Sequence, residues 1–234
     1  MTLKFVVVRQ FWRLLPKFLR GTAFLQSMRK KLAALLAGYS DIYSPEFYRT
    51  VADPEAARAA PVIARFIREA FAPRRVIDVG CGTGTLLEAL KESGCECLGL
   101  EYADAAITAC RRRGLNARKF DVTRPKQADS LGRFDVCVSL EVAEHLPANF
   151  AAMYLDLLCS FAPVLVFTAA TPGQGGIDHV NEQPHEYWIS RLKARGFALD
   201  IVLSEAWRAD WKQAGVVSWY YANIMVFRSQ SGRS

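Results

Sequence analysis

The chain of 234 residues contains no Cys-x-x-Cys pair and only three histidines, so a structural zinc site is not expected. Its six cysteines lie mostly within apolar stretches, which favours free thiols in a reducing compartment. No uninterrupted apolar run approaches the roughly 20 residues that a membrane-spanning helix needs. The compact apolar core and cleavage site of a signal peptide are also missing. These absences predict a cytoplasmic protein, and the length fits one ordinary α/β domain with an extension.

Acidic residues are absent from residues 1–40, which hold eight of the 30 basic residues. The net charge of +7 therefore belongs to this segment, and residues 41–234 are near neutral. Basic and apolar groups recur at helical spacing, which predicts an amphipathic helical arm over 1–40. The arm either lies on an anionic membrane through residues 1–37, as a peripheral protein does, or packs on the domain or a partner. A further alternative is translation from Met28.

A glycine-rich stretch occupies residues 76–84, where an apolar run is followed by Gly80, Gly82 and Gly84. The pattern predicts a buried strand, a sharp turn and then a helix. Asp78 places within the strand a carboxylate that an ordinary core would exclude. A dinucleotide-binding fingerprint would need glycine at position 85, which is Thr85. The alternative is a tight turn that binds no ligand.

The pattern Asp-x-Gly-x-Gly-x-Gly resembles motif I of the class I S-adenosylmethionine-dependent methyltransferases. The resemblance covers residues 60–228 and implies S-adenosylmethionine as cofactor, with the glycine turn against its methionine part. The expected fold is α/β, with a Rossmann-like, doubly wound, mostly parallel seven-stranded sheet and an N-terminal helical extension. Sequence patterns predict strands at 76–79, 97–101, 117–122, 134–140, 164–169, 198–204 and 221–228.

Acidic residues stand at the ends of two of these strands. Glu101, about 20 residues after the glycine turn, can accept hydrogen bonds from both ribose hydroxyls. Asp121 and Val122 match the family positions that contact adenine, although such an acid can also be a simple turn residue. The predicted cofactor-binding residues are Asp78, Gly80, Cys81, Gly82, Gly84, Glu101, Tyr102, Asp121, Val122 and Leu140.

The fourth strand runs into Glu141-x-x-Glu144-His145, where the transferred methyl group lies in this fold. The string resembles ubiquinone-type O-methyltransferases and also the small-RNA 3′-terminal ribose methyltransferases. In the latter, two acids and two histidines bind a divalent metal, so a further ligand here would be His179 or His185. We expect no metal, and predict catalytic roles for Glu141, Glu144 and His145, the last as general base or substrate contact. The alternative is that His145 and Glu144 only shape the loop.

A long polar loop at residues 171–183 and the aromatic residues after it are expected to recognise the acceptor. The predicted substrate contacts are His179, His185, Tyr187, Trp188 and Trp207. Aromatic residues ahead of the glycine strand are either lid residues or helix-packing groups, namely Tyr39, Tyr43, Phe47 and Tyr48.

The predicted reaction is O-methylation of a small-molecule, glycan or lipid-linked acceptor. One alternative is a metal-dependent RNA ribose methyltransferase, which the near-neutral domain disfavours because a nucleic-acid site is usually basic. A second alternative is a catalytically silent, membrane-docked protein that only binds the cofactor.

Overall fold

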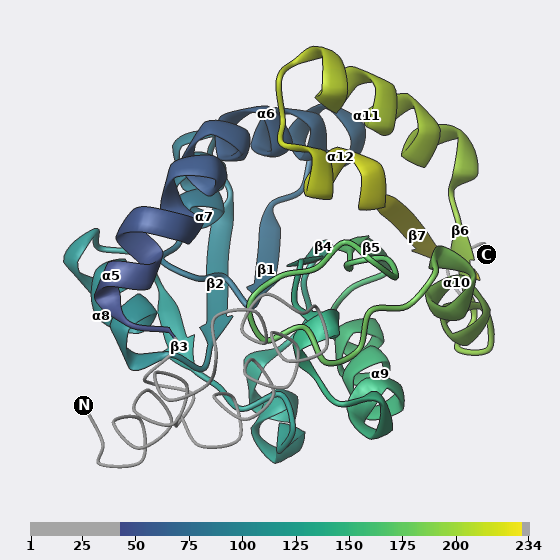
Figure 1. The fold of residues 1–234 in the computed structure, drawn as a ribbon, viewed down its shortest axis with the longest axis horizontal. Coiled ribbons are helices and arrows are strands. Elements are labelled where there is room, and N and C mark those ends of the chain that lie inside the picture. Colours follow the sequence, from purple (N-terminus) through teal and green to yellow (C-terminus); the bar gives the residue numbers. More distant parts are fainter. Residues whose placement is uncertain (1–42, 231–234) are drawn as a thin grey trace, which may run out of the picture.

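The structure, a computed structural model, describes residues 43–230. The predictions for the basic arm, Tyr39 and Met28 lie outside these residues. Within them the chain forms one seven-stranded sheet in the order β3-β2-β1-β4-β5-β7-β6 (Figure 1). Only β7 runs antiparallel to its neighbours, which confirms the expected mostly parallel sheet. The strands are β1 (Arg75–Val79), β2 (Glu96–Glu101), β3 (Ala117–Lys119), β4 (Val136–Leu140), β5 (Val164–Thr168), β6 (Phe197–Leu199) and β7 (Met225–Ser229).

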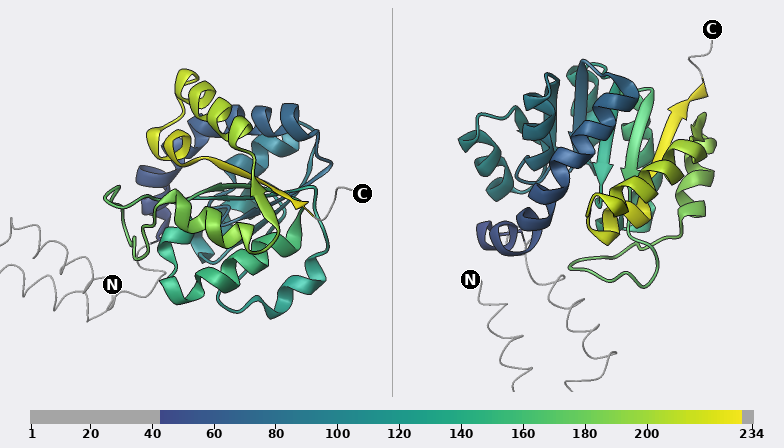
Figure 2. Two further views of the ribbon diagram at one scale, coloured as in Figure 1. Left: turned by 90° about the vertical axis from the view of Figure 1, so that its right-hand side faces the viewer. Right: turned by 90° about the horizontal axis from the view of Figure 1, so that it is seen from above.

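Helices cover both faces of the sheet (Figures 1 and 2). Their bounds are α5 (Pro45–Phe47), a π-helical turn (Tyr48–Ala52), α6 (Asp53–Phe71), α7 (Thr85–Glu92), α8 (Asp104–Arg112), α9 (Ala151–Phe161), α10 (His185–Lys193), α11 (Ile201–Gln213) and α12 (Ser218–Asn223). Short 3₁₀ turns occur at Pro125–Leu131, Ala143–His145 and Ala148–Phe150. No helix among the described residues is long and apolar enough to cross a bilayer.

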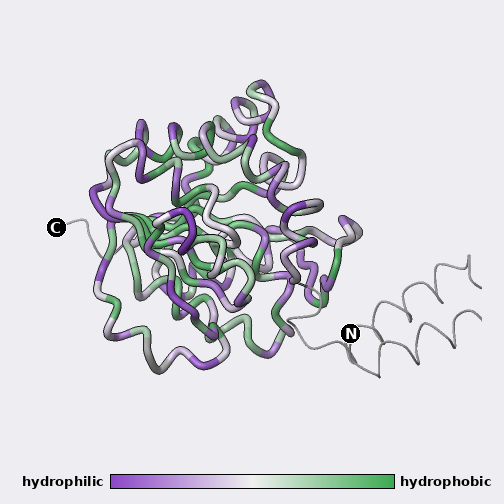
Figure 3. The backbone as a smooth tube through the Cα atoms, turned by 90° about the vertical axis from the view of Figure 1, so that its left-hand side faces the viewer, coloured by the Kyte–Doolittle hydropathy of each residue, from purple (hydrophilic) through white to green (hydrophobic). Residues whose placement is uncertain are grey.

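The sheet separates the two largest apolar clusters of the core. Successive side chains of a strand point to opposite faces, so Val136 and Val138 join one cluster while Cys137 joins the other. One cluster contains residues of α6, α7 and α11, and the other contains residues of α9 and α10. Figure 3 shows the apolar strands gathered in the interior of the molecule. The sheet is thus covered on both faces, as strands rich in valine and leucine require.

The predicted strand at 198–204 is wrong beyond Leu199. Asp200 accepts a hydrogen bond from the backbone N–H of Leu203 at 3.1 Å and caps α11. The apolar run Ile201–Leu203 therefore opens a helix, and β6 keeps only three residues. The last strand also begins later than predicted, because Ser218–Asn223 forms α12.

The parallel register brings the carboxyl ends of the central strands to one edge of the sheet. Val79 of β1 pairs with Leu100 of β2, and Leu140 of β4 pairs with Thr168 of β5. The glycine turn is fixed to the neighbouring strand, since the N–H groups of Gly80 and Cys81 both donate to the Leu100 carbonyl. In an open α/β sheet this edge is where ligands bind.

Candidate functional site

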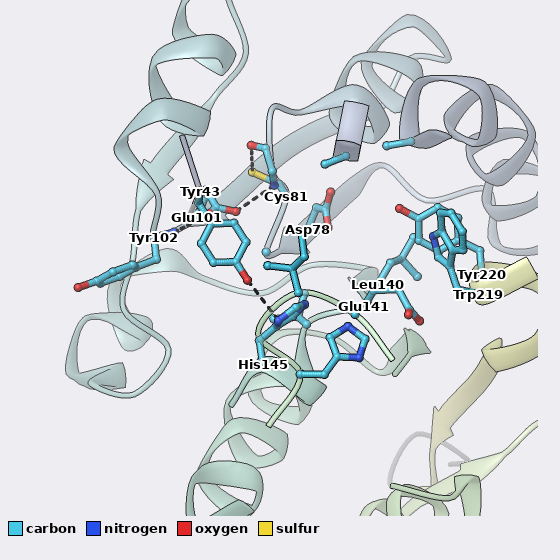
Figure 4. A pocket seen from close by; sticks show the side chains of 18 of the residues that line it. Tyr43, Asp78, Cys81, Glu101, Tyr102, Leu140, Glu141, His145, Trp219 and Tyr220 are labelled. Atoms are coloured by element: carbon cyan, nitrogen blue, oxygen red, sulfur yellow. Dashed lines mark hydrogen bonds between the residues drawn. The ribbon is translucent and has the colours of Figure 1, made fainter. Parts of the chain in front are cut away.

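The carboxyl ends of β1, β2 and β4 open into a pocket of about 1030 Å³. Figure 4 shows the pocket between two walls, with Tyr43, Glu101 and Tyr102 on one side and Leu140, Glu141, Trp219 and Tyr220 on the other. Of the ten predicted cofactor residues, all but Gly84 line this space. These nine predicted residues therefore surround one connected space.

The three glycines of the turn all adopt positive φ, and each has a different neighbour. A Cβ on Gly80 would lie 2.4 Å from a Val142 methyl, and one on Gly84 would lie 2.6 Å from Leu115. A Cβ on Gly82 would meet only the Tyr48 ring, at 3.7 Å. Gly80 and Gly84 are therefore needed for packing, whereas Gly82 leaves its Cβ position open toward the pocket.

Glu101 holds the glycine turn in place. Its carboxylate accepts hydrogen bonds from the backbone N–H groups of Gly82 at 3.0 Å and of Tyr102 and Ala103 at 2.7 Å. Burial raises the pKa of Glu101, and these three N–H groups act in the opposite direction. A buried carboxylate with three donors joins β1, β2 and the start of α8.

Asp78 and Asp121 supply two further carboxylates to the pocket. Burial, and then the charge of Glu101, raise the pKa of Asp78 to about 7. Asp121 accepts from both the backbone N–H and the hydroxyl of Thr123 through the same oxygen, Oδ1. Among the described residues, its other oxygen pairs with Arg124, 3.7 Å away at the surface. Asp121 is thus both a turn residue and a group that can still accept a hydrogen bond from the pocket.

The N-terminal segment forms one wall and contacts both halves of the site. The Thr83 hydroxyl, in the glycine turn, donates to Asp53 at 2.6 Å. The Tyr43 hydroxyl lies 3.2 Å from Nδ1 of His145 (Figure 4). Phe47 and Tyr48 pack edge-on against one another beside Tyr43. The predicted lid residues among the described ones therefore both line the pocket and pack together.

Glu141 ends β4 in a left-handed conformation, with φ of 54°. Its carboxylate accepts hydrogen bonds from the side-chain amides of Gln174 at 2.8 Å and Asn223 at 3.2 Å. The side-chain amide of Asn223 also donates a hydrogen bond to the side-chain oxygen of Gln174, at 2.7 Å. Burial raises the pKa of Glu141, and these amides oppose the rise. Backbone strain of this kind persists where surrounding contacts fix it, as this polar network does here.

Glu144, His145 and His179 form a compact group beside Glu141. One ligand atom from each lies within 4.8 Å of the others. The loop that carries His179 is fixed to this turn, because the Glu144 carbonyl accepts from the N–H groups of Val180 and Asn181. The two imidazole rings are 4.9 Å apart and nearly perpendicular. These residues could hold a metal ion, and His179 rather than His185 completes the group.

Burial controls the protonation of this group. It raises the pKa of Glu144 well above the ordinary value, as does the charge of Glu141, while backbone N–H groups of Glu144 and Ala170 act oppositely. Burial, and then His179, lower the pKa of His145 to about 4, although the Asp178 carbonyl acts oppositely. His145 is consequently neutral near pH 7. It can accept a proton there, but a group with so low a pKa is a weak general base.

The comparison with known families decides the identity of the fold. The family described as "Methyltransferase domain" matches residues 52–216. The chain belongs to this family. Two curated relatives of the methyltransferase domain are ubiquinone biosynthesis O-methyltransferases. The one from Methylococcus capsulatus is 36% identical over 94 residues, which are 37% of this chain and 40% of the relative. The one from Pseudomonas aeruginosa is 32% identical over 85 residues, 34% of this chain and 37% of the relative.

Solved methyltransferases share the fold of this domain. A sugar N-methyltransferase from Streptoalloteichus superposes with a TM-score of 0.61 at 19% identity, covering 82% of this chain and 94% of its own. An S-adenosylmethionine-dependent methyltransferase from Archaeoglobus fulgidus gives a TM-score of 0.58 at 18% identity, covering 82% of this chain and all of its own. At these identities the likeness establishes the fold alone. The chain matches about two fifths of the length of the curated relatives.

Two predicted substrate contacts of the methyltransferase domain are wrong. Trp188 is fully buried against Phe167, and Trp207 is 2% exposed and stacks on Trp211. Both belong to the core clusters that α10 and α11 form with the sheet, because their helices turn these large apolar rings inward.

His185 and Tyr187 also lie outside the lining of the pocket, whereas the predicted contact His179 is part of it. The pocket is also lined by Gln174, Tyr220 and Asn223, none of which the sequence singled out, although Gln174 belongs to the predicted loop at 171–183. Asn223 falls within the predicted strand at 221–228, whereas the structure places it at the end of α12. In the sequence, Asn223 stands out as a polar residue within a mostly apolar run. That feature indicates a pocket residue only when the position of α12 is known.

Proposed function

We propose that this chain is an S-adenosylmethionine-dependent O-methyltransferase that acts on a small hydroxylated acceptor. The observation that carries the proposal is the single pocket that joins the glycine turn and Glu101 to the group around His145. The glycine turn and Glu101 suit a nucleoside-containing cofactor. The group around His145 consists of neutral and acidic side chains suited to activating a hydroxyl.

The cofactor residues fit S-adenosylmethionine, which when bound supplies a methyl group on a sulfonium. The open Cβ position of Gly82 leaves room for close approach of a ligand to the backbone. Among the described residues, the hydrogen bond to Oε2 of Glu101 comes from Gly82, so a lone pair remains for a ribose hydroxyl. Asp121 retains an acceptor oxygen for the adenine amino group. A site with these groups intact argues against the catalytically silent alternative.

The acceptor is proposed to be uncharged or cationic and partly apolar. Among the described residues, the pocket lining contains no lysine or arginine and several acids. A polyanionic RNA would be repelled by such a lining, which argues against the RNA alternative. Exposed apolar side chains of Tyr102, Ile177 and Trp219 surround the same pocket. This rim fits an aromatic, glycan or lipid-linked acceptor.

Catalysis is proposed to rest on alignment and exclusion of water. Tyr43 orients His145 through their hydrogen bond. Glu141, held by Gln174 and Asn223, fixes the end of β4 beside the acceptor. The acceptor proton is proposed to leave toward His145 and His179, the two members of the Glu144, His145 and His179 group that line the pocket.

Methyl transfer from labelled S-adenosylmethionine tests this function. The acceptor panel contains catechol, alkylated catechols, simple glycosides, primary amines and a short RNA. Mass spectrometry with fragmentation of each product identifies the methylated atom. We expect transfer to a hydroxyl of a catechol or glycoside and none to RNA. Transfer only to nitrogen, or S-adenosylhomocysteine binding without any transfer to the panel or to fractionated cell extract, would contradict the proposal.

We further propose that the basic arm docks the enzyme on an anionic membrane as a cytoplasmic peripheral protein. The support is the charge of residues 1–40, which carry eight cations and no acid. Each basic residue near an anionic surface contributes about 1 kcal/mol. Docking there would bring the apolar rim of the pocket to a lipid-linked acceptor.

A further inference from the structure

Two cysteine thiols meet beneath the glycine turn. Cys81 belongs to the turn itself, and Cys110 lies in α8, where it is fully buried. Both thiols donate to the carbonyl oxygen of Gly82, with sulfur–oxygen distances of 3.7 Å for Cys81 (Figure 4) and 3.3 Å for Cys110. A hydrogen bond between the two side chains raises the pKa of Cys81 and lowers the pKa of Cys110. The two sulfur atoms are therefore neighbours, although they come from different elements.

The sulfur atoms occupy room that two glycines leave. A Cβ on Gly99 of β2 would lie 2.5 Å from the sulfur of Cys81, and a Cβ on Gly84 would lie 3.0 Å from the sulfur of Cys110. Close packing of this kind transmits displacements, because an atom that moves must displace its neighbours. A change in the position of either sulfur atom would therefore move the backbone of the glycine turn.

The two thiols also hold the Gly82 peptide in place. Its N–H donates to Glu101 at 3.0 Å, and its carbonyl accepts from Cys81 and Cys110. A thiol is a weak donor, whereas a disulfide has no S–H to donate. Oxidation of the pair would therefore remove both of these donors from the position at which the cofactor is proposed to approach the backbone.

We propose that Cys81 and Cys110 form a reversible disulfide that closes the pocket to S-adenosylmethionine. Cys81 lines the pocket, so hydrogen peroxide can reach its sulfur when the pocket is empty. The Cys81 thiolate attacks one peroxide oxygen, the O–O bond breaks, and hydroxide leaves, which gives a sulfenic acid. Cys110, whose pKa is the lower of the two, then attacks this sulfur; the S–O bond breaks, the oxygen leaves as water, and the S–S bond forms. Overall, two thiols lose two protons and two electrons, and one peroxide molecule becomes two water molecules.

The disulfide and the cofactor oppose one another. An S–S bond of about 2 Å draws the two sulfur atoms together, and with them the glycine turn and α8. S-adenosylmethionine in the pocket would in turn cover Cys81. Any such coupling between two sites is reciprocal, so a bound cofactor protects the thiols and the disulfide weakens cofactor binding. This proposal goes beyond the proposed O-methyltransferase function, because neither the acceptor nor methyl transfer enters it.

Peptide mapping of the full chain tests whether the bond forms. The reduced protein is treated with hydrogen peroxide, its remaining thiols are alkylated, and it is digested with trypsin. The tryptic peptides 76–91 and 92–111 carry Cys81 and Cys110, and a second cut after Glu101 separates Cys110 from Cys95 and Cys97. We expect a Cys81–Cys110 linkage that dithiothreitol reverses and that saturating S-adenosylhomocysteine slows at least fivefold. Mass spectra without this linkage, or an equal rate of linkage with and without the ligand, would overturn the proposal.

Calorimetry of S-adenosylhomocysteine tests the effect on the pocket. Each protein is compared with its own reduced form, and diamide serves as oxidant because it joins neighbouring thiols without oxidising single ones. Oxidised wild type should bind at least tenfold more weakly, within the range typical of coupled sites. C110S and C110A should each change less than twofold, whereas C159S removes a cysteine of α9 and should respond as the wild type does. A wild-type affinity that diamide leaves within twofold, or an equal loss in C110S and C110A, would refute the closure. Because the linkage is detected without an acceptor, it can be tested even if the proposed O-methylation fails.

Discussion

Replacing Glu101 by alanine should affect both folding and cofactor binding, because one carboxylate accepts from the N–H groups of Gly82, Tyr102 and Ala103. A buried N–H left without an acceptor costs about 1–3 kcal/mol, although water from the pocket can satisfy part of that loss. We therefore expect the free energy of unfolding to fall by about 2–4 kcal/mol. The affinity for S-adenosylhomocysteine should fall by about 1–3 kcal/mol, or roughly 5- to 150-fold, as the turn loosens and a ribose acceptor disappears.

Urea denaturation followed by circular dichroism measures the first quantity, and titration calorimetry measures the second. Glu96→Ala is the matched control, because Glu96 begins the same strand, is exposed and, among the described residues, forms its ion pair with the surface residue Arg75. It should change unfolding by less than about 0.5 kcal/mol. If Glu101→Ala has the wild-type urea midpoint and binds the ligand within twofold, the role assigned to this carboxylate is refuted.

Three further outcomes are expected. The raised pKa of Asp78, about 7, means that the native state binds a proton that the unfolded state releases near pH 4. Stability should therefore fall between pH 4 and pH 7 by on the order of 4 kcal/mol, and Asp78→Asn should lack this part of the decline in urea titrations. If the free energy of unfolding falls equally with pH in the wild type and in Asp78→Asn, Asp78 is not the cause of the decline. Gly84→Ala should destabilise the fold more than Gly82→Ala, whose larger effect should be on cofactor affinity, as melting and calorimetry will compare. Full-length chain should co-sediment with anionic vesicles at low salt and dissociate at high salt, whereas a chain beginning at Tyr39 should remain in solution; equal sedimentation of both would exclude the arm as the anchor.

The parts of the fold that the sequence predicted are those in which local pattern and tertiary structure agree. Residues 76–84 formed a strand and turn as expected, and Glu101 lies at the end of its strand. The prediction of the sixth strand was wrong beyond Leu199, because the short apolar run Ile201–Leu203 also fits a strand pattern. The N-terminal cap at Asp200 makes this run the start of a helix instead. Trp207 and Trp211, four residues apart, were in fact one helical face.

The site was predictable only where a residue follows a strand directly. Glu141 follows β4 directly, and Glu144 and His145 lie in the next turn, so topology alone places this segment at the pocket end of the sheet. His179 reaches them through a loop whose path depends on hydrogen bonds to the Glu144 carbonyl. Asn223, near the other end of the chain, reaches the same place through its hydrogen bond to Glu141. Contacts of this kind join distant segments, and no local spacing reveals them.

The region shared with the family spans residues 52–216, yet the pocket uses side chains on both sides of it. Tyr43 and Tyr48 precede the shared region, and Trp219 and Asn223 follow it. A chimera that exchanged only residues 52–216 between two relatives would therefore join the glycine turn of one protein to part of the pocket wall of the other. Sequence changes at either end of the chain can thus alter this pocket while the match to the family stays recognisable.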